Sequence, residues 1–487
     1  MEETDRDEKI PVVFQNRKVD VHSFLVLLIL CCAQFTVALD LSIVNVALPS
    51  IQHDLGFSTQ NLQWVVSAYS LTFGGLLLLG GKVGDVFGRR QFFLLGAFLF
   101  ALASFLGGVA SSQDWLISTR IIQGIAAAFL SPNALALITT TFEEGPERNR
   151  ALGIVGTVMS SGVAVGNILG GLLTAGPGWR WVLFVNVPIL VGMSLFALIL
   201  LPSTSQQSER TRIDVPGALT ITLSLMIFVY VLTEGSNMSW MSIRLPGLLT
   251  FALVLLVTFV WIEVRAKEPL VRFALFRLRP LAAANLISLL APGTYGAMLF
   301  FLSLYMQEVL RYSALRTGLA LIPLELALGL MTNLVPRLIT RVGTKQILVA
   351  AIVVMVIGLL LLLRITPEEN YLGTVLPALL IIGVGIGALF NGIVIAATSG
   401  VRREEQGVAV GLMSTIQQVG NGLVLAVMVS IAQARTASVH TQGIGMNVAL
   451  VEGFRAAFLA GVGVMVIALF TVFVVMGKES HTSPISR

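Results

Sequence analysis

Residues 80–90 read Gly-Gly-Lys-Val-Gly-Asp-Val-Phe-Gly-Arg-Arg, and this short charged run lies between two long apolar segments. It places Lys82, Asp85, Arg89 and Arg90 in a turn that is too short to be a domain. In such a turn the charges meet lipid headgroups, helix ends or each other. The pattern is typical of a hinge in a membrane transporter.

The composition is that of a polytopic membrane protein. The chain has 487 residues, of which 56% are hydrophobic and 12% charged, and its mean hydropathy is +0.88. These values lie far outside those of soluble globular proteins. A helix needs about 20 apolar residues to cross a bilayer, so we predict an all-α protein with fourteen transmembrane helices. The expected spans are 23–48, 60–80, 91–110, 115–138, 150–174, 180–201, 215–233, 246–264, 281–306, 315–339, 346–364, 373–397, 407–431 and 454–476.

The basic residues predict the orientation in the membrane. Counted over the expected loops, 23 of the 31 Lys and Arg residues lie on the side of both termini and seven on the other side, while Arg120 lies within a span. Cytoplasmic loops retain positive charge, so both termini are expected in the cytoplasm. The net charge of +5 is then explained by topology and anionic lipid, and no nucleic-acid partner is expected. The first apolar run is too long for a signal-peptide core and should remain as a span.

The sequence has no pattern of an enzyme or a metal site. The two cysteines, Cys31 and Cys32, are adjacent in the first span, and the four histidines lie outside the span interiors. Metal-ligand spacings, a nucleophile elbow and a phosphate-binding loop are missing from the sequence. We therefore expect no enzymatic activity, no metal and no cofactor.

An internal repeat divides the chain into two halves. Residues 159–161 (Met-Ser-Ser) and 166–167 (Gly-Asn) match residues 413–415 (Met-Ser-Thr) and 420–421 (Gly-Asn), 254 positions later. The hinge run has a weaker counterpart in residues 336–345. Repeated halves are common in transporters. The offset maps the first six spans onto the last six and leaves two inserted spans between them.

This repeat predicts the organisation of the chain. The expected parts are a cytoplasmic segment 1–22, a six-helix bundle 23–201, a linker with the inserted spans 202–280, a second six-helix bundle 281–476 and a cytoplasmic tail 477–487.

Several motifs resemble those of the major facilitator superfamily, and within it the fourteen-span drug:proton antiporters. The similar stretches are Leu39–Pro49 (Leu-Asp-Leu-Ser-Ile-Val-Asn-Val-Ala-Leu-Pro), Gln63–Tyr69, Gly81–Arg90, Arg120–Gly124, Arg212–Gly217 and Glu268–Arg277. The resemblance covers nearly the whole chain. It implies a major facilitator fold and export of hydrophobic compounds in exchange for protons, which serve as the coupling ion.

The fifth span carries a glycine motif of the same family. It reads Gly162-x-x-x-Gly166-Asn167-x-x-Gly170-Gly171, with Asn167 at the position of the usual proline. Gly162, Gly166 and Gly170 recur every four residues on one helix face, which allows close helix packing. Ordinary packing explains these glycines, and a functional role requires that they lie where the two halves slide past each other.

In the resembled family the hinge loop latches the halves in the outward-open state. The residues that carry this expectation are Gly81, Lys82, Gly84, Asp85, Gly88, Arg89 and Arg90. The alternative is a tight glycine turn with topological charge.

Two carboxylates lie well inside apolar spans and are the candidates for proton coupling. They are Asp40 in the outer half of the first span and Glu325 near the middle of the tenth, two residues after Pro323. A carboxylate in the bilayer is costly and therefore a functional candidate. Arg120, four residues before Gly124 of the fourth-span motif, enters at a depth that allows it to pair with Asp40. For both carboxylates a purely structural role remains the alternative.

Aromatic, Met and amide side chains are the candidates for a substrate cavity, because they give adaptable contact to lipophilic compounds. The expected residues are Trp64, Tyr69, Asn133, Tyr295, Met298, Phe301, Tyr305, Asn391, Met413 and Gln417. Packing against other helices or lipid is the alternative for each.

The sequence thus predicts a monomeric, proton-coupled exporter of hydrophobic and cationic drugs or dyes in a bacterial cytoplasmic membrane, with membrane lipids as its surroundings. One alternative keeps the fold and exports lipids or a dedicated metabolite. Another is a sensor or scaffold that has lost transport. A pore is disfavoured, because no ring of polar residues recurs.

Overall fold

The computed structural model describes residues 21–201, 214–234, 244–266, 277–368, 370–402 and 405–476. Within these residues fourteen helices are long and apolar enough to cross a membrane, and the same residues contain no strand. The all-α class and the fourteen spans are therefore confirmed. The predicted tail 477–487, nearly all of segment 1–22, residues 212–213 of the motif stretch 212–217 and residues 268–276 of the motif stretch 268–277 lie outside the described residues.

The first half contains six long helices and two short ones, and the inserted pair follows. Their bounds are α1 Val21–Leu55, α2 Thr59–Leu62, α3 Trp64–Phe87, α4 Arg89–Gly108, α5 Gln113–Thr141, α6 Pro146–Ala175, α7 Arg180–Phe184 and α8 Asn186–Leu200, then α9 Val215–Glu234 and α10 Arg244–Arg265. The second half contains α11 Arg279–Leu304, η2 Tyr305–Val309, α12 Ala314–Val342, α13 Thr344–Leu362, η3 Tyr371–Val375, α14 Leu376–Thr398, α15 Gln406–His440 and α16 Met446–Val475.

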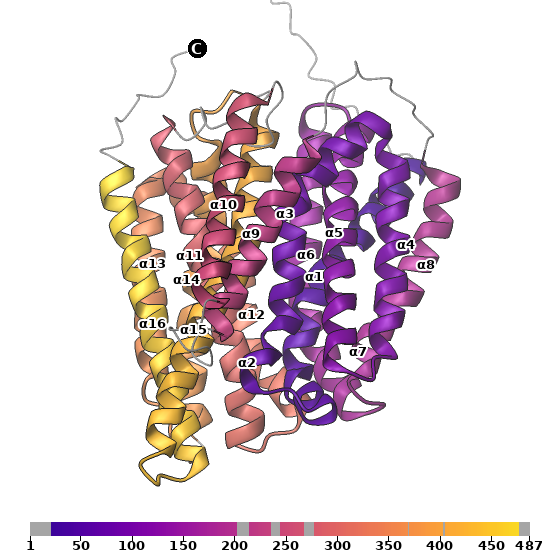
Figure 1. Ribbon diagram of the computed structural model, residues 1–487. Coiled ribbons are helices and arrows are strands. Elements are labelled where there is room, and N and C mark those ends of the chain that lie inside the picture. The colour runs from indigo at the N-terminus through magenta and orange to yellow at the C-terminus, as the bar shows by residue number, and fades with distance from the viewer. Residues whose placement is uncertain are drawn as a thin grey trace, which may run out of the picture.

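Several helices are longer than their apolar runs. The predicted span 407–431 is part of α15, which continues to His440, and α16 begins at Met446 rather than at 454. A helix satisfies its own backbone hydrogen bonds and need not end at the edge of the hydrocarbon. The α15–α16 hairpin accordingly projects at the lower end of the molecule (Figure 1).

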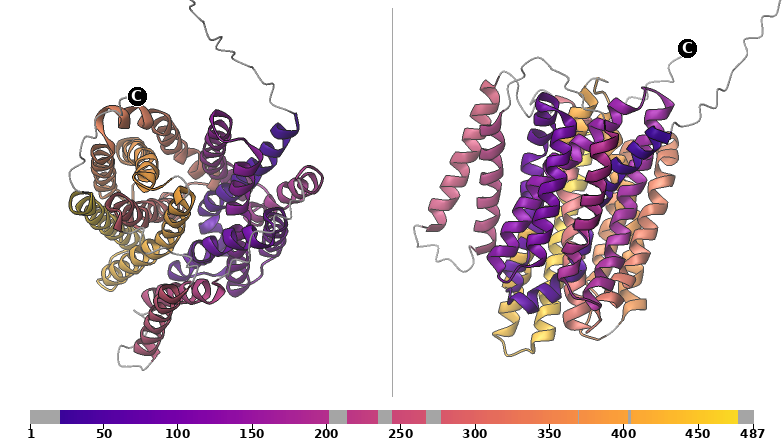
Figure 2. Two further views of the ribbon diagram at one scale, coloured as in Figure 1. Left: turned by 90° about the horizontal axis from the view of Figure 1, so that it is seen from above. Right: turned by 90° about the vertical axis from the view of Figure 1, so that its right-hand side faces the viewer.

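Each half is a bundle with its own apolar core. In the first, α1 packs against α6, and α5 packs against α3 and α4; in the second, α11 packs against α15 and α16, and α14 packs against α12 and α13. The two bundles lie side by side, as Figures 1 and 2 show. Helix α1 begins and α16 ends at the same end of the molecule, which we call the terminal end; the opposite end is the distal end.

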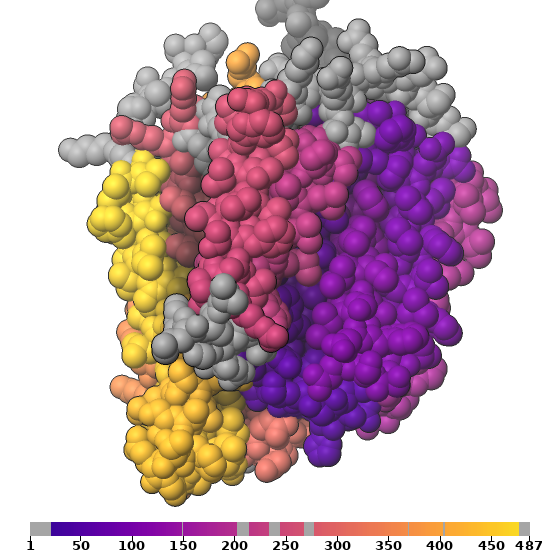
Figure 3. Space-filling model, in the orientation of Figure 1, coloured from indigo at the N-terminus to yellow at the C-terminus, as the bar shows by residue number. Residues whose placement is uncertain are grey.

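The two halves meet along two seams, where α6 contacts α12 and α3 contacts α15. Only the second seam is covered by the inserted pair: α9 packs against α3 and α15, and α10 packs against α9. Trp64 of α3 lies beside Tyr230 of α9, with ring centroids 6.5 Å apart. Figure 2 shows the pair outside the two bundles, and Figure 3 shows it over the junction between them.

Equivalent glycines place the helices of the internal repeat. A Cβ atom at Gly166 of α6 would lie 2.9 Å from the backbone oxygen of Leu39, and one at Gly420 of α15 would lie 2.8 Å from the Cα of Leu289. These two glycines are 254 residues apart and pack α6 on α1 and α15 on α11 in the same manner. The geometry therefore supports the repeat that the sequence predicts.

The hinge run is mostly helical, which corrects the prediction that Lys82, Asp85, Arg89 and Arg90 all lie in a turn. Lys82 and Asp85 belong to α3, Arg89 begins α4, and the turn is Gly88 alone. Its φ of 115° is a conformation that L side chains rarely adopt.

Candidate functional site

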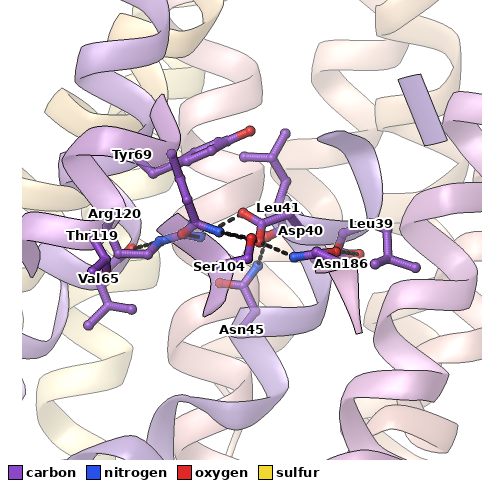
Figure 4. A network of polar contacts seen from close by, with 12 residues as sticks. Leu39, Asp40, Leu41, Asn45, Val65, Tyr69, Ser104, Thr119, Arg120 and Asn186 are labelled. Atoms are coloured by element: carbon purple, nitrogen blue, oxygen red, sulfur yellow. Dashed lines mark hydrogen bonds and ion pairs between the residues drawn. The ribbon is translucent and has the colours of Figure 1, made fainter. Parts of the chain in front are cut away.

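Asp40 lies in a dense polar network inside the first half (Figure 4). Arg120 donates from Nη1 to its Oδ2 at 2.6 Å, and Asn186 donates from Nδ2 to its Oδ1 at 2.9 Å. Gln123 donates a longer bond of 3.4 Å to the same Oδ1. Asp40 is fully buried, so these donors replace the water that a carboxylate would otherwise bind. The predicted pairing of Asp40 with Arg120 is present.

Arg120 is also held by groups other than Asp40. It donates from Nε to the backbone oxygen of Val65 at 2.8 Å and from Nη1 to Gln123 at 2.8 Å, and its guanidinium lies 4.5 Å from the centroid of the Tyr69 ring. Gly124 lets α5 approach α3, since a Cβ there would lie 2.5 Å from the backbone oxygen of Tyr69. The network joins α1, α3, α4, α5 and α8. None of the hydrogen bonds described here involves a residue of the second half.

Glu325 occupies a second site, where the two halves touch. Asn167 of α6 donates from Nδ2 to Glu325 Oε1 at 3.0 Å, and Tyr295 of α11 donates its hydroxyl to the same oxygen at 3.1 Å. All three side chains are at least nine-tenths buried. The carboxylate thus belongs to one half and receives a hydrogen bond from the other.

Sequence reasoning named these three residues but did not group them. Tyr295 was expected in a substrate cavity and Asn167 only as a departure from a glycine motif. The sequence signal was the replacement itself, because an amide within an apolar span needs a polar partner. Gln123, Asn186 and Ser104, to whose Oγ Gln123 donates at 2.8 Å, were missed as members of the Asp40 network.

The motif glycines of α6 serve two different contacts. A Cβ at Gly162 would lie 2.9 Å from the oxygen of Phe35, and one at Gly170 would lie 2.6 Å from that of Ile43, both in α1. A Cβ at Gly171 would instead lie 2.7 Å from the oxygen of Ala314 in α12. The face with four-residue spacing therefore packs within the first half, and it is Gly171 that lies between the halves, because it is offset by about 100° around the helix.

The α6–α12 seam is tight in its distal part. Gly171 faces Ala314, Gly318 meets the backbone of Asn167, and Glu325 bonds to the Asn167 side chain. Toward the terminal end both helices are exposed on several faces, at residues 152–154, 156 and 157 of α6 and at residues 336–338 and 340–342 of α12, and a Cβ at Gly156 or Gly329 would meet nothing within 4 Å. The seam is closed from the distal end to Glu325.

Comparisons with known proteins agree with this architecture. Residues 30–425 match the family model of the Major Facilitator Superfamily. The chain belongs to the major facilitator superfamily. It is 37% identical to the puromycin resistance protein of Streptomyces alboniger over 465 residues, covering 94% of this chain and 92% of that protein. It is 36% identical to the cephamycin export protein of Amycolatopsis lactamdurans, covering 94% of this chain and 93% of that protein.

Among solved structures, a bacterial homologue of the human lysosomal transporter Spinster aligns with a TM-score of 0.66 at 18% identity, covering 94% of this chain and 97% of that one. At this identity the likeness shows the major facilitator fold. The chain is accordingly a transporter of this superfamily and not an enzyme.

In this transporter the hinge residues bond within the first half. Arg89 donates from Nε to Asp85 Oδ1 at 2.7 Å and from Nη1 to the oxygen of Ala136, and Arg90 donates to the oxygen of Leu198 in α8. Gly84 packs on the side chain of Asn133 in α5. The close packing expected of the glycines is present, while the latch role stays a prediction.

The other expected cavity residues do not form one lining. Met298, Phe301 and Tyr305 are buried in the second half, with Phe301 packed on Phe454 at a centroid distance of 5.6 Å. Asn133 donates to the oxygens of Gly80 and Phe129, and Asn391 donates to those of Gly387 and Thr332. Met413 and Gln417 lie on α15, and Trp64 lies under α9. Met298, Phe301 and Tyr305 thus pack in the second bundle, while a role of the expected residues in substrate binding stays a prediction.

A hollow of about 610 Å³ lies at the distal end of the second half. Its lining is Tyr312, Arg316, Leu319, Ala320, Asn370, Tyr371 and Leu372, with none of the expected cavity residues.

Proposed function

We propose that this transporter is a proton-coupled exporter of hydrophobic compounds, cationic ones among them, that works by alternating access. The observation that carries the proposal is the position of Glu325: a buried carboxylate of one half that is bonded to an amide of the other. The names of the relatives, a puromycin resistance protein and a cephamycin export protein, support export of antibiotics or similar molecules.

The distribution of basic residues supports one orientation. Because 23 of the 31 Lys and Arg residues are on the side of the termini, the proposal has the terminal end facing the cytoplasm of a bacterial cell. The seam closed at the distal end and exposed toward the terminal end then corresponds to a state that faces the cytoplasm. Substrate enters this state from the cytoplasm or the inner leaflet.

Glu325 couples the proton to the substrate because it can bind only one of these two ligands at a time. An ionised carboxylate attracts a cationic substrate, and a protonated one does not. Exchange follows when the proton that arrives from outside is released inside and a substrate takes its place. A neutral substrate depends less on this charge, so the proton must then act mainly through conformation.

Asp40 is the second coupling acid in the proposal. Its proton uptake requires that Arg120, Asn186 and Gln123 release the carboxylate, so protonation would loosen five helices of the first half at once. The alternative for Asp40 is a static ion pair that holds these helices together, and the variants described in the Discussion separate the two.

The test is transport in vesicles with the purified protein and a defined pH gradient. Export of a cationic dye should follow the proton gradient, vanish when an ionophore collapses it, and fall at least tenfold in Glu325→Gln. Glu263→Gln is the matched control, since Glu263 is a buried carboxylate of the inserted α10. Gradient-independent transport, or transport of lipid but no dye, would refute drug–proton exchange.

A further inference from the structure

Asn167 occupies a proline position of the superfamily motif and forms a side-chain bond from α6 to α12. The closed part of the seam lies on its distal side. A Cβ at Gly171, four residues further along α6, would lie 2.7 Å from the oxygen of Ala314 and 2.9 Å from the Cα of Leu315. Asn167 therefore lies at the inner limit of the contact that keeps the distal side shut.

Packing alone does not favour an amide here. Asn167 is 1% exposed, and its Oδ1 atom is buried with no hydrogen-bond partner among the described residues. A buried acceptor without a donor is destabilising. The cost of this unpaired oxygen is offset by the hydrogen bond that the amide nitrogen of the same side chain donates to Glu325.

Two donors converge on one oxygen of Glu325, and they come from different halves. The Asn167 amide reaches it from the first half, and the Tyr295 hydroxyl reaches it from the second. Hydrogen bonds to an ionised carboxylate are about twice as strong as those between neutral groups. The bond across the seam is therefore strongest when Glu325 is ionised and carries no substrate.

We propose that Asn167 is a positioning residue that locks the seam when the transporter is empty. This inference rests on the proposed function. An exchanger must not change state with neither ligand bound, since an empty return would dissipate the proton gradient. The ionised Glu325 holds Asn167 and keeps the distal seam closed. A proton or a cationic substrate on Glu325 weakens this bond and releases the seam.

Among the described residues, no ionisable group other than Tyr295 is hydrogen-bonded to Glu325. Tyr295 is the titratable residue bonded to it. The remaining charged or titratable residues on described elements packed against α12 lie near helix ends, in the Asp40 network or in other contacts. They are His22, Cys31, Cys32, Asp40, His53 and Asp54 of α1, Glu147, Arg148 and Arg150 of α6, Tyr305 and Glu308 of η2, Lys345 of α13 and Tyr371 of η3.

The repeat supplies an internal comparison. Asn421, the counterpart of Asn167, donates to Gln418 of its own helix at 2.8 Å. With the offset of 254, the counterpart of Glu325 is Leu71 of α3, which packs with Val229 of the inserted α9. The lock is thus built into one seam, the one that no inserted helix covers.

The test measures the seam directly, without transport. Spin labels at Leu172 and Leu319, both about half exposed beside the distal contact, report its opening in lipid nanodiscs after Cys31 and Cys32 are replaced by alanine. In the otherwise wild-type protein the seam should be closed at high pH and open increasingly at low pH. Asn167→Leu should raise the open fraction at high pH about tenfold, as expected for a lost bond to a charged group, and should let protons leak through substrate-free liposomes.

Two comparisons distinguish a lock from a packing effect. Tyr295→Phe removes the donor that lies in the same half as Glu325, so the seam should stay closed at high pH. In a Glu325→Leu background, Asn167→Leu should have no further effect, because the acceptor is already gone. Asn167→Ser keeps a small polar side chain that is too short to reach Glu325. It repeats the test if the leucine variant fails to fold.

Wild-type distances and no leak in the Asn167 variants would overturn the lock. So would an effect of equal size in the Glu325→Leu background. Failure of the proposed function has a different signature: wild-type protein would show no gradient-driven export, whatever the label distances report.

Discussion

Replacement of Arg120 by methionine would leave Asp40 buried without its cationic partner. The variant loses the 2.6 Å bond to Asp40, the bond to Val65 and the ring contact with Tyr69, while Asn186 and Gln123 remain as neutral donors. Removal of one member of a buried ion pair typically costs about 3–5 kcal/mol. We expect a loss of that size in the free energy of unfolding.

The double variant Asp40→Asn/Arg120→Met should recover most of this loss, because no charge is left uncompensated and an uncharged replacement of a buried pair is often close to neutral. The measurement is denaturant unfolding of purified protein in detergent, followed by tryptophan fluorescence. Arg180→Met is the control: its ion pair with Asp54 at the distal end is 40% and 45% exposed, and such pairs contribute about 0–1 kcal/mol.

The same double variant decides the role of Asp40. If Asp40 couples proton movement to transport, the variant should be folded and inactive in pH-gradient-driven export. If the pair is only structural, the folded double variant should transport. A single Arg120→Met variant as stable as wild type, or a double variant as unstable as the single one, would refute the energetic reasoning.

Three further predictions follow from the geometry of the two halves. Glu325→Gln should reduce export of cationic dyes at least tenfold and of neutral substrates less, measured in vesicles, whereas Glu263→Gln should leave both unchanged; equal loss for both dye classes would contradict a charge-selective site. Asp85→Asn removes the partner of Arg89 and should shift label distances across the terminal end toward the cytoplasm-facing state in folded protein, while unchanged distances would argue against the latch. Gly171→Ala should prevent full closure of the distal seam and lower the free energy of unfolding by about 1–3 kcal/mol, since its Cβ would lie 2.7 Å from the backbone oxygen of Ala314. Gly192→Ala, with open space around it, should be neutral in thermal unfolding. Equal unfolding midpoints for the two variants would argue against the seam contact.

The sequence predicted best those features that depend on local patterns. Apolar runs of membrane length predicted the fourteen spans, and the spacing of Gly166 and Gly420 predicted the repeated halves. The Asp40–Arg120 pair was also predictable, because two lone charges at similar depth in one bundle lower their desolvation cost by pairing.

Contacts between distant helices were not predictable in the same way. Asn167 and Glu325 are 158 residues apart, and nothing in either span shows which helix its polar side chain faces. The expected cavity residues are hard to distinguish from core residues for a related reason. Aromatic and Met side chains suit substrate contact and core packing equally, and Phe301 and Tyr305 pack inside the second bundle.

The inserted helices explain why the two seams differ. Val229 of α9 packs on Leu71, and Ser430 of α15 donates to the oxygen of Leu232 at 2.7 Å, so α9 is bound to both halves at the α3–α15 seam. A helix attached to both sides limits how far that seam can separate. Relative motion of the halves must then be larger at the α6–α12 seam. A contact there that depends on charge acts where the halves separate most. In the proposed mechanism, protonation of Glu325 therefore acts at the seam where the distance between the halves changes most.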